Sequence, residues 1–153
     1  TSIGGRAFKY CLALDSIIIP DKVDSIYGGA FAYSGVKNIS FGKALSTIYG
    51  TAFENCHYLK NVIIPDNVTK INNGAFMDCT SLVSVTMPKN AKFTGIPQQT
   101  FQGCTKLVSV TIPEGVTTIG TKAFLGTAIT EITLPSTLTS IAATVLPSSL
   151  SLM

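Results

Sequence analysis

The side chains with the most reactive chemistry in this sequence are four cysteines and one histidine. Cys56, Cys79 and Cys104 follow one another at intervals of 23 and 25 residues, and Cys11 precedes Cys56 by 45 residues. Near-equal spacing would stack these side chains in a column inside a repeating fold, where a thiol acts as a small buried apolar group. Two alternatives remain. Disulfides could join adjacent coils, and zinc could bind, although zinc needs ligands that converge as a tetrahedron.

Neither catalysis nor cofactor binding has a recognisable motif. His57 has no nucleophile or carboxylate at a telling spacing, so we expect an exposed loop histidine. The pairs Gly4-Gly5 and Gly28-Gly29 are not followed by the Lys-Ser/Thr of a phosphate-binding loop. We expect the recurring glycines, and Asn72 in the same region, to supply positive φ angles at bends. The sequence therefore predicts no enzyme activity, no catalytic residue, no metal and no cofactor.

Composition narrows the class of protein and of partner. The 153 residues suit one domain, and 46% apolar against 12% charged residues excludes a disordered tail. The net charge of +3 is mild and scattered and includes a single arginine, which excludes a surface that tracks nucleic-acid phosphates. No apolar run approaches the roughly 20 residues that span a bilayer, so we expect no membrane insertion within this segment.

Internal repeats organise the whole chain. Isoleucines recur at intervals of 22 to 25 residues, at Ile3, Ile26, Ile48, Ile71, Ile96, Ile119 and Ile141. A phenylalanine stands five residues after each of the first six, at Phe8, Phe31, Phe53, Phe76, Phe101 and Phe124. Four units continue with L-x-x-I/V-x-I/M-P, starting at Leu14, Leu59, Leu82 and Leu107. A V-T-x-I segment or a close variant closes the unit, as in 116–119.

Each unit is too short to bury its own apolar side chains. The L-x-x-I-x-I segment alternates apolar β-branched residues and usually ends at a proline, which predicts a short strand. V-T-x-I predicts a second, shorter strand, and the Ala-Phe segment between them a helical turn or irregular arc. Units of this length make successive strands parallel, so the coils must stack as a solenoid with the phenylalanines in single file.

The combined motif L-x-x-I-x-I-P, V-T-x-I-G-x-x-A-F-x-x-C resembles the BspA-type leucine-rich repeat, also called the Treponema pallidum type. The resemblance implies a right-handed leucine-rich-repeat superhelix. Its parallel sheet lies on the concave face, with short second strands and helical turns on the convex side. It also implies a non-enzymatic cell-surface or secreted protein of bacteria or protozoa that mediates adhesion. We expect one domain over 1–153, with about six coils of 22–25 residues and a degenerate coil at 147–152 serving as a cap. The chain starts inside a coil, so we expect a segment of a longer protein.

Three units depart from the pattern. The second and sixth have an arc one residue shorter and carry Ser34 and Thr127 in the cysteine position. Extra residues lie between Pro88 and Ile96, where we expect a bulged loop that is either a tolerated insertion or a binding element. Charged residues after successive strands alternate in sign, which predicts a ladder of exposed ion pairs formed by Asp21, Lys43, Asp66, Lys89 and Glu114.

A partner would dock on the concave sheet, and we expect that partner to be a protein, such as a host extracellular or cell-surface protein. The outward strand positions are small, neutral and rich in hydroxyl groups, and they lack the aromatic anchors of tight interfaces. They are Ser16, Ile18, Asn38, Ser40, Asn61, Ile63, Ser84, Thr86, Ser109, Thr111, Glu131 and Thr133. The alternatives are that these are simply good strand formers, and that the chain is a spacer which displays another domain.

Overall fold

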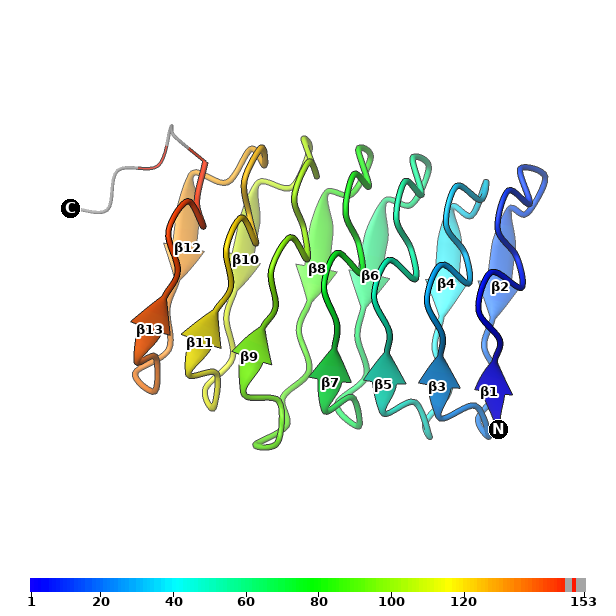
Figure 1. Cartoon of the computed structure of the whole chain (residues 1–153), viewed down its shortest axis with the longest axis horizontal. Helices are drawn as coiled ribbons and strands as arrows, with labels where there is room; N and C mark the ends of the chain where they lie inside the picture. The colour runs from blue at the N-terminus through cyan, green and yellow to red at the C-terminus, as the bar shows by residue number, and fades with distance from the viewer. Residues whose placement is uncertain (148–149, 151–153) are drawn as a thin grey trace.

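A computed structural model describes residues 1–147 and 150. Two classes of strand alternate along the chain, and each class forms one row in Figure 1. The long strands are β2 (Ser16–Ile18), β4 (Asn38–Ser40), β6 (Asn61–Ile63), β8 (Ser84–Thr86), β10 (Ser109–Thr111) and β12 (Glu131–Thr133). The short strands are β1 (Ser2–Ile3), β3 (Ser25–Ile26), β5 (Thr47–Ile48), β7 (Lys70–Ile71), β9 (Gly95–Ile96), β11 (Thr118–Ile119) and β13 (Ser140–Ile141). Coil 1 comprises β1 and β2, coil 2 comprises β3 and β4, and so on to coil 7, which begins with β13.

Every strand pairing joins equivalent positions of neighbouring coils and is parallel. Ile26 of β3, for example, pairs with Ile48 of β5, which pairs with Ile71 of β7. The short strands form two sheets, β1-β3-β5-β7 and β9-β11-β13, and the long strands form the pairs β2-β4, β6-β8 and β10-β12. This arrangement confirms the solenoid of parallel strands that the sequence period predicts, and it agrees with the leucine-rich-repeat fold that the resemblance implies.

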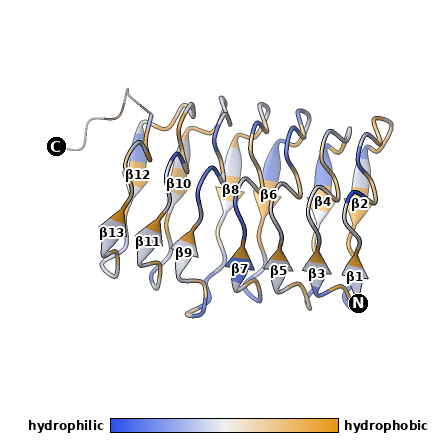
Figure 2. Cartoon of the chain, viewed as in Figure 1, coloured by the Kyte–Doolittle hydropathy of each residue, from blue (hydrophilic) through white to orange (hydrophobic). Residues whose placement is uncertain are grey.

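The core runs along the solenoid axis as a file of phenylalanine rings. Consecutive rings from Phe8 to Phe124 lie 5.1, 5.1, 5.2, 5.7 and 5.6 Å apart, and their planes differ by at most 10°. The five rings after Phe8 are completely buried. Figure 2 shows the same regularity in the row of short strands, whose apolar ends fall at one level along the stack. The isoleucines that end β3, β5, β7, β9 and β11 are buried in this core. The predicted single file is confirmed.

The arc that leads from a short to a long strand is a run of turns, so the predicted helical turn is wrong. Each arc holds two residues with positive φ, such as Thr51 (56°) and Asn55 (57°) in coil 3. An α-helix needs negative φ at every residue. The arc is bonded to its neighbour instead, since the Phe53 amide donates to the Ala75 carbonyl at 2.8 Å. The part of the chain that the structure describes contains no helix long and apolar enough to cross a membrane.

Glycine serves the arcs in two ways, and only one was predicted. Gly29 and Gly74 have φ of 66° and 65°, as expected. Gly28 and Asn72, however, do not have positive φ, so that part of the prediction is wrong. At Gly28 the constraint is close approach, because an added Cβ would lie 3.2 Å from the carbonyl oxygen of Gly50 in the next coil.

Both rows of strands are interrupted between coils 4 and 5, next to the inserted residues. Among the described residues, no ladder joins β7 to β9 or β8 to β10. The insertion is not a loop throughout, because Phe93 is buried in the core at the position that Val68 and Val116 occupy in other coils. The arcs still cross this joint, since the Phe76 amide donates to the Thr100 carbonyl at 3.0 Å.

The last described coil covers coil 6 through Val145, which is buried and whose carbonyl accepts the Phe124 amide at 2.8 Å. The predicted cap at 147–152 lies largely outside the described residues.

Candidate protein-interaction face

The row of long strands presents twelve side chains to solvent. In each strand the first and third residues are exposed and the middle residue points inward, so burial alternates along the strand. We call these twelve outward residues, from Ser16 to Thr133, the long-strand face. Ile18 and Ile63 are its only large apolar members, and they are 80% and 70% exposed. That this face binds a partner stays a prediction.

Hydroxyl and amide groups on this face bond to one another across coils. Ser84 Oγ donates to Asn61 Oδ1 at 2.7 Å, and Asn38 Nδ2 donates to Ser16 Oγ at 3.3 Å. Glu131 is the only charged residue of the twelve. The face is therefore a nearly neutral surface of donors and acceptors, suited to short-range contacts rather than to long-range charge steering.

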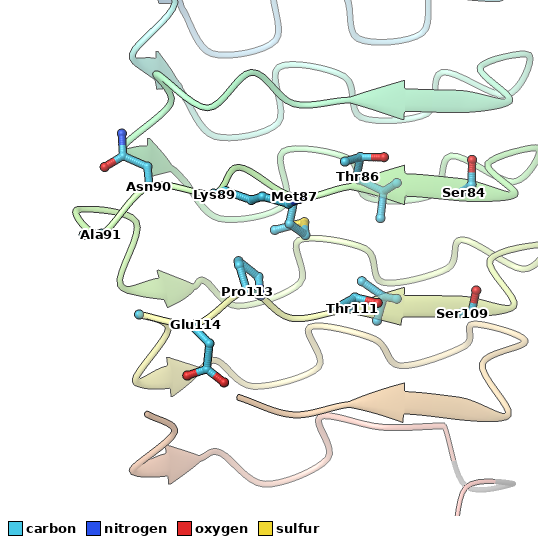
Figure 3. Close-up of a pocket in the computed structure, with 13 residues that line it drawn as sticks. Ser84, Thr86, Met87, Lys89, Asn90, Ala91, Ser109, Thr111, Pro113 and Glu114 are labelled. Carbon is cyan, nitrogen blue, oxygen red and sulfur yellow. The ribbon is translucent and has the colours of Figure 1, made fainter. Parts of the chain in front are cut away.

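A groove of about 770 Å³ lies between β8 and β10, where the ladder is open. Figure 3 shows that coils 4 and 5 supply its walls, with Ser84 and Thr86 on one side and Ser109 and Thr111 on the other. The lining continues past the strands into the inserted loop, which contributes Lys89, Asn90 and Ala91. A smaller groove of about 540 Å³ lies at the other opening of this row, between β4 and β6.

The apolar part of the larger groove was not predicted. Met87 and Pro113 line it beyond the strand ends, and the inner residues Val85 and Val110 also reach its floor. In the sequence these four occupy ordinary core or strand-ending positions. The insertion before Ile96 was the available signal, since extra residues at one coil boundary can hold two neighbouring strands out of register with each other.

The predicted ladder of ion pairs is wrong. Asp21 and Asp66 instead accept hydrogen bonds from the backbone amides of Lys43 and Lys89, at 3.1 and 2.8 Å. Glu114 accepts from the amide and hydroxyl of Ser136, both at 3.0 Å. These bonds lower the pKa of the Glu114 carboxyl. A short carboxylate reaches the nearby backbone of the next coil more readily than a distant lysine ammonium, so each acid ties two coils together.

The cysteine column is built into the core. Cys56, Cys79 and Cys104 are completely buried, and each thiol donates to the phenylalanine carbonyl of the preceding coil at 3.1 to 3.2 Å. Burial raises the pKa of the Cys79 thiol well above its usual value. All four cysteines are free thiols, which contradicts the disulfide alternative and agrees with the small-apolar role. Cys11 is the exception in burial, because it is exposed.

His57 lies beside a hydroxyl group of the next coil. Its Nδ1 lies 3.2 Å from Thr80 Oγ1, and the pair is exposed. Within the described residues, no group of three or more His, Cys, Asp or Glu side chains converges as a metal site would. This geometry assigns His57 to the surface of the arc.

Comparison with known proteins shows which proteins this chain is similar to. The model of the BspA type leucine-rich repeat region matches residues 1–95 and 26–152, with six copies. A leucine-rich-repeat protein from Eubacterium ventriosum aligns with 90% of this chain and 44% of its own, at 20% identity and a TM-score of 0.78. No curated protein matches the sequence.

Two further solved structures are similar. A leucine-rich cell surface protein from Faecalibacterium prausnitzii aligns with 97% of this chain and 57% of its own, at 26% identity and a TM-score of 0.57. The T. pallidum leucine-rich-repeat protein aligns with 82% of this chain and 69% of its own, at 24% identity and a TM-score of 0.59. The chain thus spans about half the length of the first two. The family match covers nearly every residue, and the chain belongs to the BspA-type leucine-rich-repeat family.

Proposed function

We propose that this chain is a single non-enzymatic adhesion domain, exposed at the cell surface or secreted, that binds a protein through its long-strand face. The observation that carries the proposal is the groove between β8 and β10, which is the larger of the two grooves in the nearly neutral row of long strands. Its walls offer four hydroxyl groups, and its floor is apolar, a combination typical of a surface that receives side chains from another protein.

Family membership supports the class of function. Leucine-rich repeats are generally protein-binding scaffolds, and the F. prausnitzii relative is described as a cell surface protein. We extend both properties to this chain as part of the proposal. The chain is expected to act within a longer protein, as its relatives exceed it in length.

The chemistry of the face sets the strength of binding. Tight interfaces depend on a few buried aromatic or arginine side chains, and the long-strand face has neither. Each coil therefore contributes little, and affinity must come from several coils or several copies acting together. We expect binding that strengthens steeply when the domain is displayed in many copies.

The experiment compares two charge-bearing variants. The face variant replaces Ser84 and Ser109 with Lys, and Thr86 and Thr111 with Glu. Its matched control places Glu at Thr118 and Lys at Ser140, which are exposed on the short-strand row. The wild type and both variants are displayed on beads and tested for attachment to purified extracellular-matrix proteins and to epithelial cells.

Attachment by the wild type and the control, with loss in the face variant, supports the proposal. Equal attachment by all three proteins would show that the long-strand face is not the binding surface. A wild type that attaches to nothing favours the alternative function, a spacer that displays another domain; the regular solenoid itself, whose length grows coil by coil, supports that alternative.

A further inference from the structure

Exposed aromatic and aliphatic side chains gather on the arcs of coils 1 to 3. Tyr10, Leu12 and Tyr58 are 62%, 72% and 57% exposed, and Tyr33 beside them is half-buried. We call these four residues the tyrosine patch. In other coils the position of Leu12 is held by Thr80 or Thr105, and that of Tyr58 by Ser81 or Lys106, so the patch is apolar where the repeat is polar.

Two of the four tyrosine-patch residues sit in a backbone conformation that suits tyrosine poorly. Tyr10 and Tyr33 have φ of 61° and 58°. The same position in the next three coils is filled by Asn55, Asp78 and Gly103, the residue types that tolerate this left-handed region. Folding alone would therefore favour a small residue at both positions, and the two rings need another explanation.

The two rings are already ordered for contact with a partner. Their centroids lie 5.2 Å apart, tilted by 33°. The Lys9 ammonium lies over both, at 5.0 Å from the Tyr10 ring and 5.6 Å from the Tyr33 ring. Tyrosines held in this way offer a large rigid surface that loses little conformational entropy on binding.

A hollow of about 370 Å³ is lined by Leu12 and Tyr58 of the tyrosine patch and by Gly35 of the short arc of coil 2. Gly35 lies so close to coil 1 that an added Cβ would fall 1.9 Å from the Leu12 carbonyl oxygen. Leu12 and Tyr58 form two sides of the hollow, and the ion pair of Asp15 and Lys37, at 2.6 Å, lies in its lining. A cavity of roughly 150 Å³ admits a benzene ring, so this hollow can receive one aliphatic or aromatic side chain.

Charge around the hollow favours an acidic partner. Lys60 occupies in coil 3 the position that Lys37 occupies in coil 2, and both are exposed. Asp15 pairs with Lys37, whereas among the described residues no carboxylate lies within ion-pair distance of Lys60. Glu54 is close to Tyr33, where it raises the pKa of that phenol. A carboxylate from a partner is therefore best accommodated on the side of the hollow where Lys37 and Lys60 lie.

We propose that the tyrosine patch is a second docking surface, which takes a protein segment carrying an aliphatic or aromatic side chain next to an acidic residue. The apolar side chain enters the hollow between Leu12 and Tyr58, and the carboxylate pairs with Lys60. This surface lies on coils 1 to 3 and adjoins the long-strand face only at its edge, where the Ser16 hydroxyl donates to Asp15. It shares no residue with the groove between β8 and β10, and it stands whether or not that groove binds a partner.

The test uses the whole chain and short fluorescent peptides in which Leu or Phe is flanked by Glu. The patch variant carries Tyr10→Asn, Tyr33→Asn, Leu12→Thr and Tyr58→Ser, so that each position takes a residue that another coil already has there. Fluorescence anisotropy should show binding by the wild type that the patch variant weakens at least about tenfold. The long-strand face variant should bind as the wild type does, which separates this proposal from the first.

Changing one charge on the protein or on the peptide tests whether the bound segment is acidic. Lys60→Gln should weaken the Glu peptides about threefold and leave peptides with Gln in place of Glu unchanged. No binding to the wild type at about 1 mM peptide, or equal binding to the patch variant, overturns the proposal. Equal binding of peptides with Lys in place of Glu overturns the acidic partner.

Folding provides a readout that needs no peptide. If the tyrosines are there for binding, Tyr10→Asn with Tyr33→Asn should leave the urea midpoint of unfolding unchanged or raise it. A clear fall in the midpoint would show that the rings stabilise the fold, and would overturn the inference from their backbone conformation.

Discussion

Replacing one ring in the middle of the phenylalanine file tests the packing on which the whole fold rests. Phe76 is completely buried and has a ring on each side, Phe53 at 5.2 Å and Phe101 at 5.7 Å. Phe→Ala in a core costs about 3–5 kcal/mol, and stacked ring pairs add about 0.5–1.5 kcal/mol each beyond the area they bury. We expect Phe76→Ala to cost about 5 kcal/mol, a large share of the about 5–15 kcal/mol that stabilises a typical domain.

Urea unfolding followed by circular dichroism measures this cost, and Phe8→Ala is the matched control. Phe8 is half-buried and stacks on one ring only, Phe31 at 5.1 Å, so its replacement should cost about 2 kcal/mol or less. Because each coil contacts only its neighbours, Phe76→Ala should also lower the slope of free energy against urea as the two halves begin to unfold separately. A cost below about 1 kcal/mol for Phe76→Ala, or equal costs for both variants, would refute this account of the core.

Three further outcomes follow from particular contacts. Gly35→Ala should destabilise the fold by about 1–3 kcal/mol in thermal unfolding, because its added Cβ would meet the Leu12 carbonyl. The control is Gly4→Ala, which should not destabilise the fold because an added Cβ there has nothing within 4 Å. Similar unfolding midpoints for the two variants would contradict the close approach at Gly35. A thiol reagent should modify only Cys11 in the folded protein and all four thiols in urea, and a second fast-reacting thiol before unfolding would contradict the buried column. The pKa of Glu114 is lowered in the fold, so its contribution is present above the ordinary carboxyl pKa and is lost as pH falls through the lowered value. The stability advantage of the wild type over Glu114→Gln should therefore shrink between about pH 6 and pH 3, and an advantage that is constant with pH would contradict it.

The repeated parts of the fold could be predicted from sequence, because the period itself encodes them. Phenylalanines at a fixed distance from an isoleucine anchor must meet when coils stack, and the strands follow from the alternation around Val110 or Val62. The twelve outward positions follow from the same alternation. The phenylalanine file, the strands and the outward positions all follow from the local pattern of apolar residues and from the stacking of the coils.

The exceptions could not be predicted, because they depend on distances between coils. The sequence shows extra residues before Phe93, but whether they form a loop or separate two strands is decided by how coils 4 and 5 pack. Charges that alternate in sign, as at Asp21 and Lys43, suggest ion pairs, yet the nearest donor to Asp21 is a backbone amide. The left-handed backbone at Tyr10 has no signal in the residue type itself.

The interruption of both strand rows between coils 4 and 5 has a mechanical consequence. Every other pair of adjacent coils among coils 1 to 7 is joined by a strand ladder on at least one row. This joint is held by hydrogen bonds between arcs, including one from the Cys104 thiol, and by the stacking of Phe76 on Phe101, which have the widest ring spacing in the file. The adhesion role proposed above implies that the chain is pulled along its length. Under such tension this joint should part first, leaving coils 1 to 4 and coils 5 to 7 as two separately folded pieces that lengthen the tether before the bound end lets go.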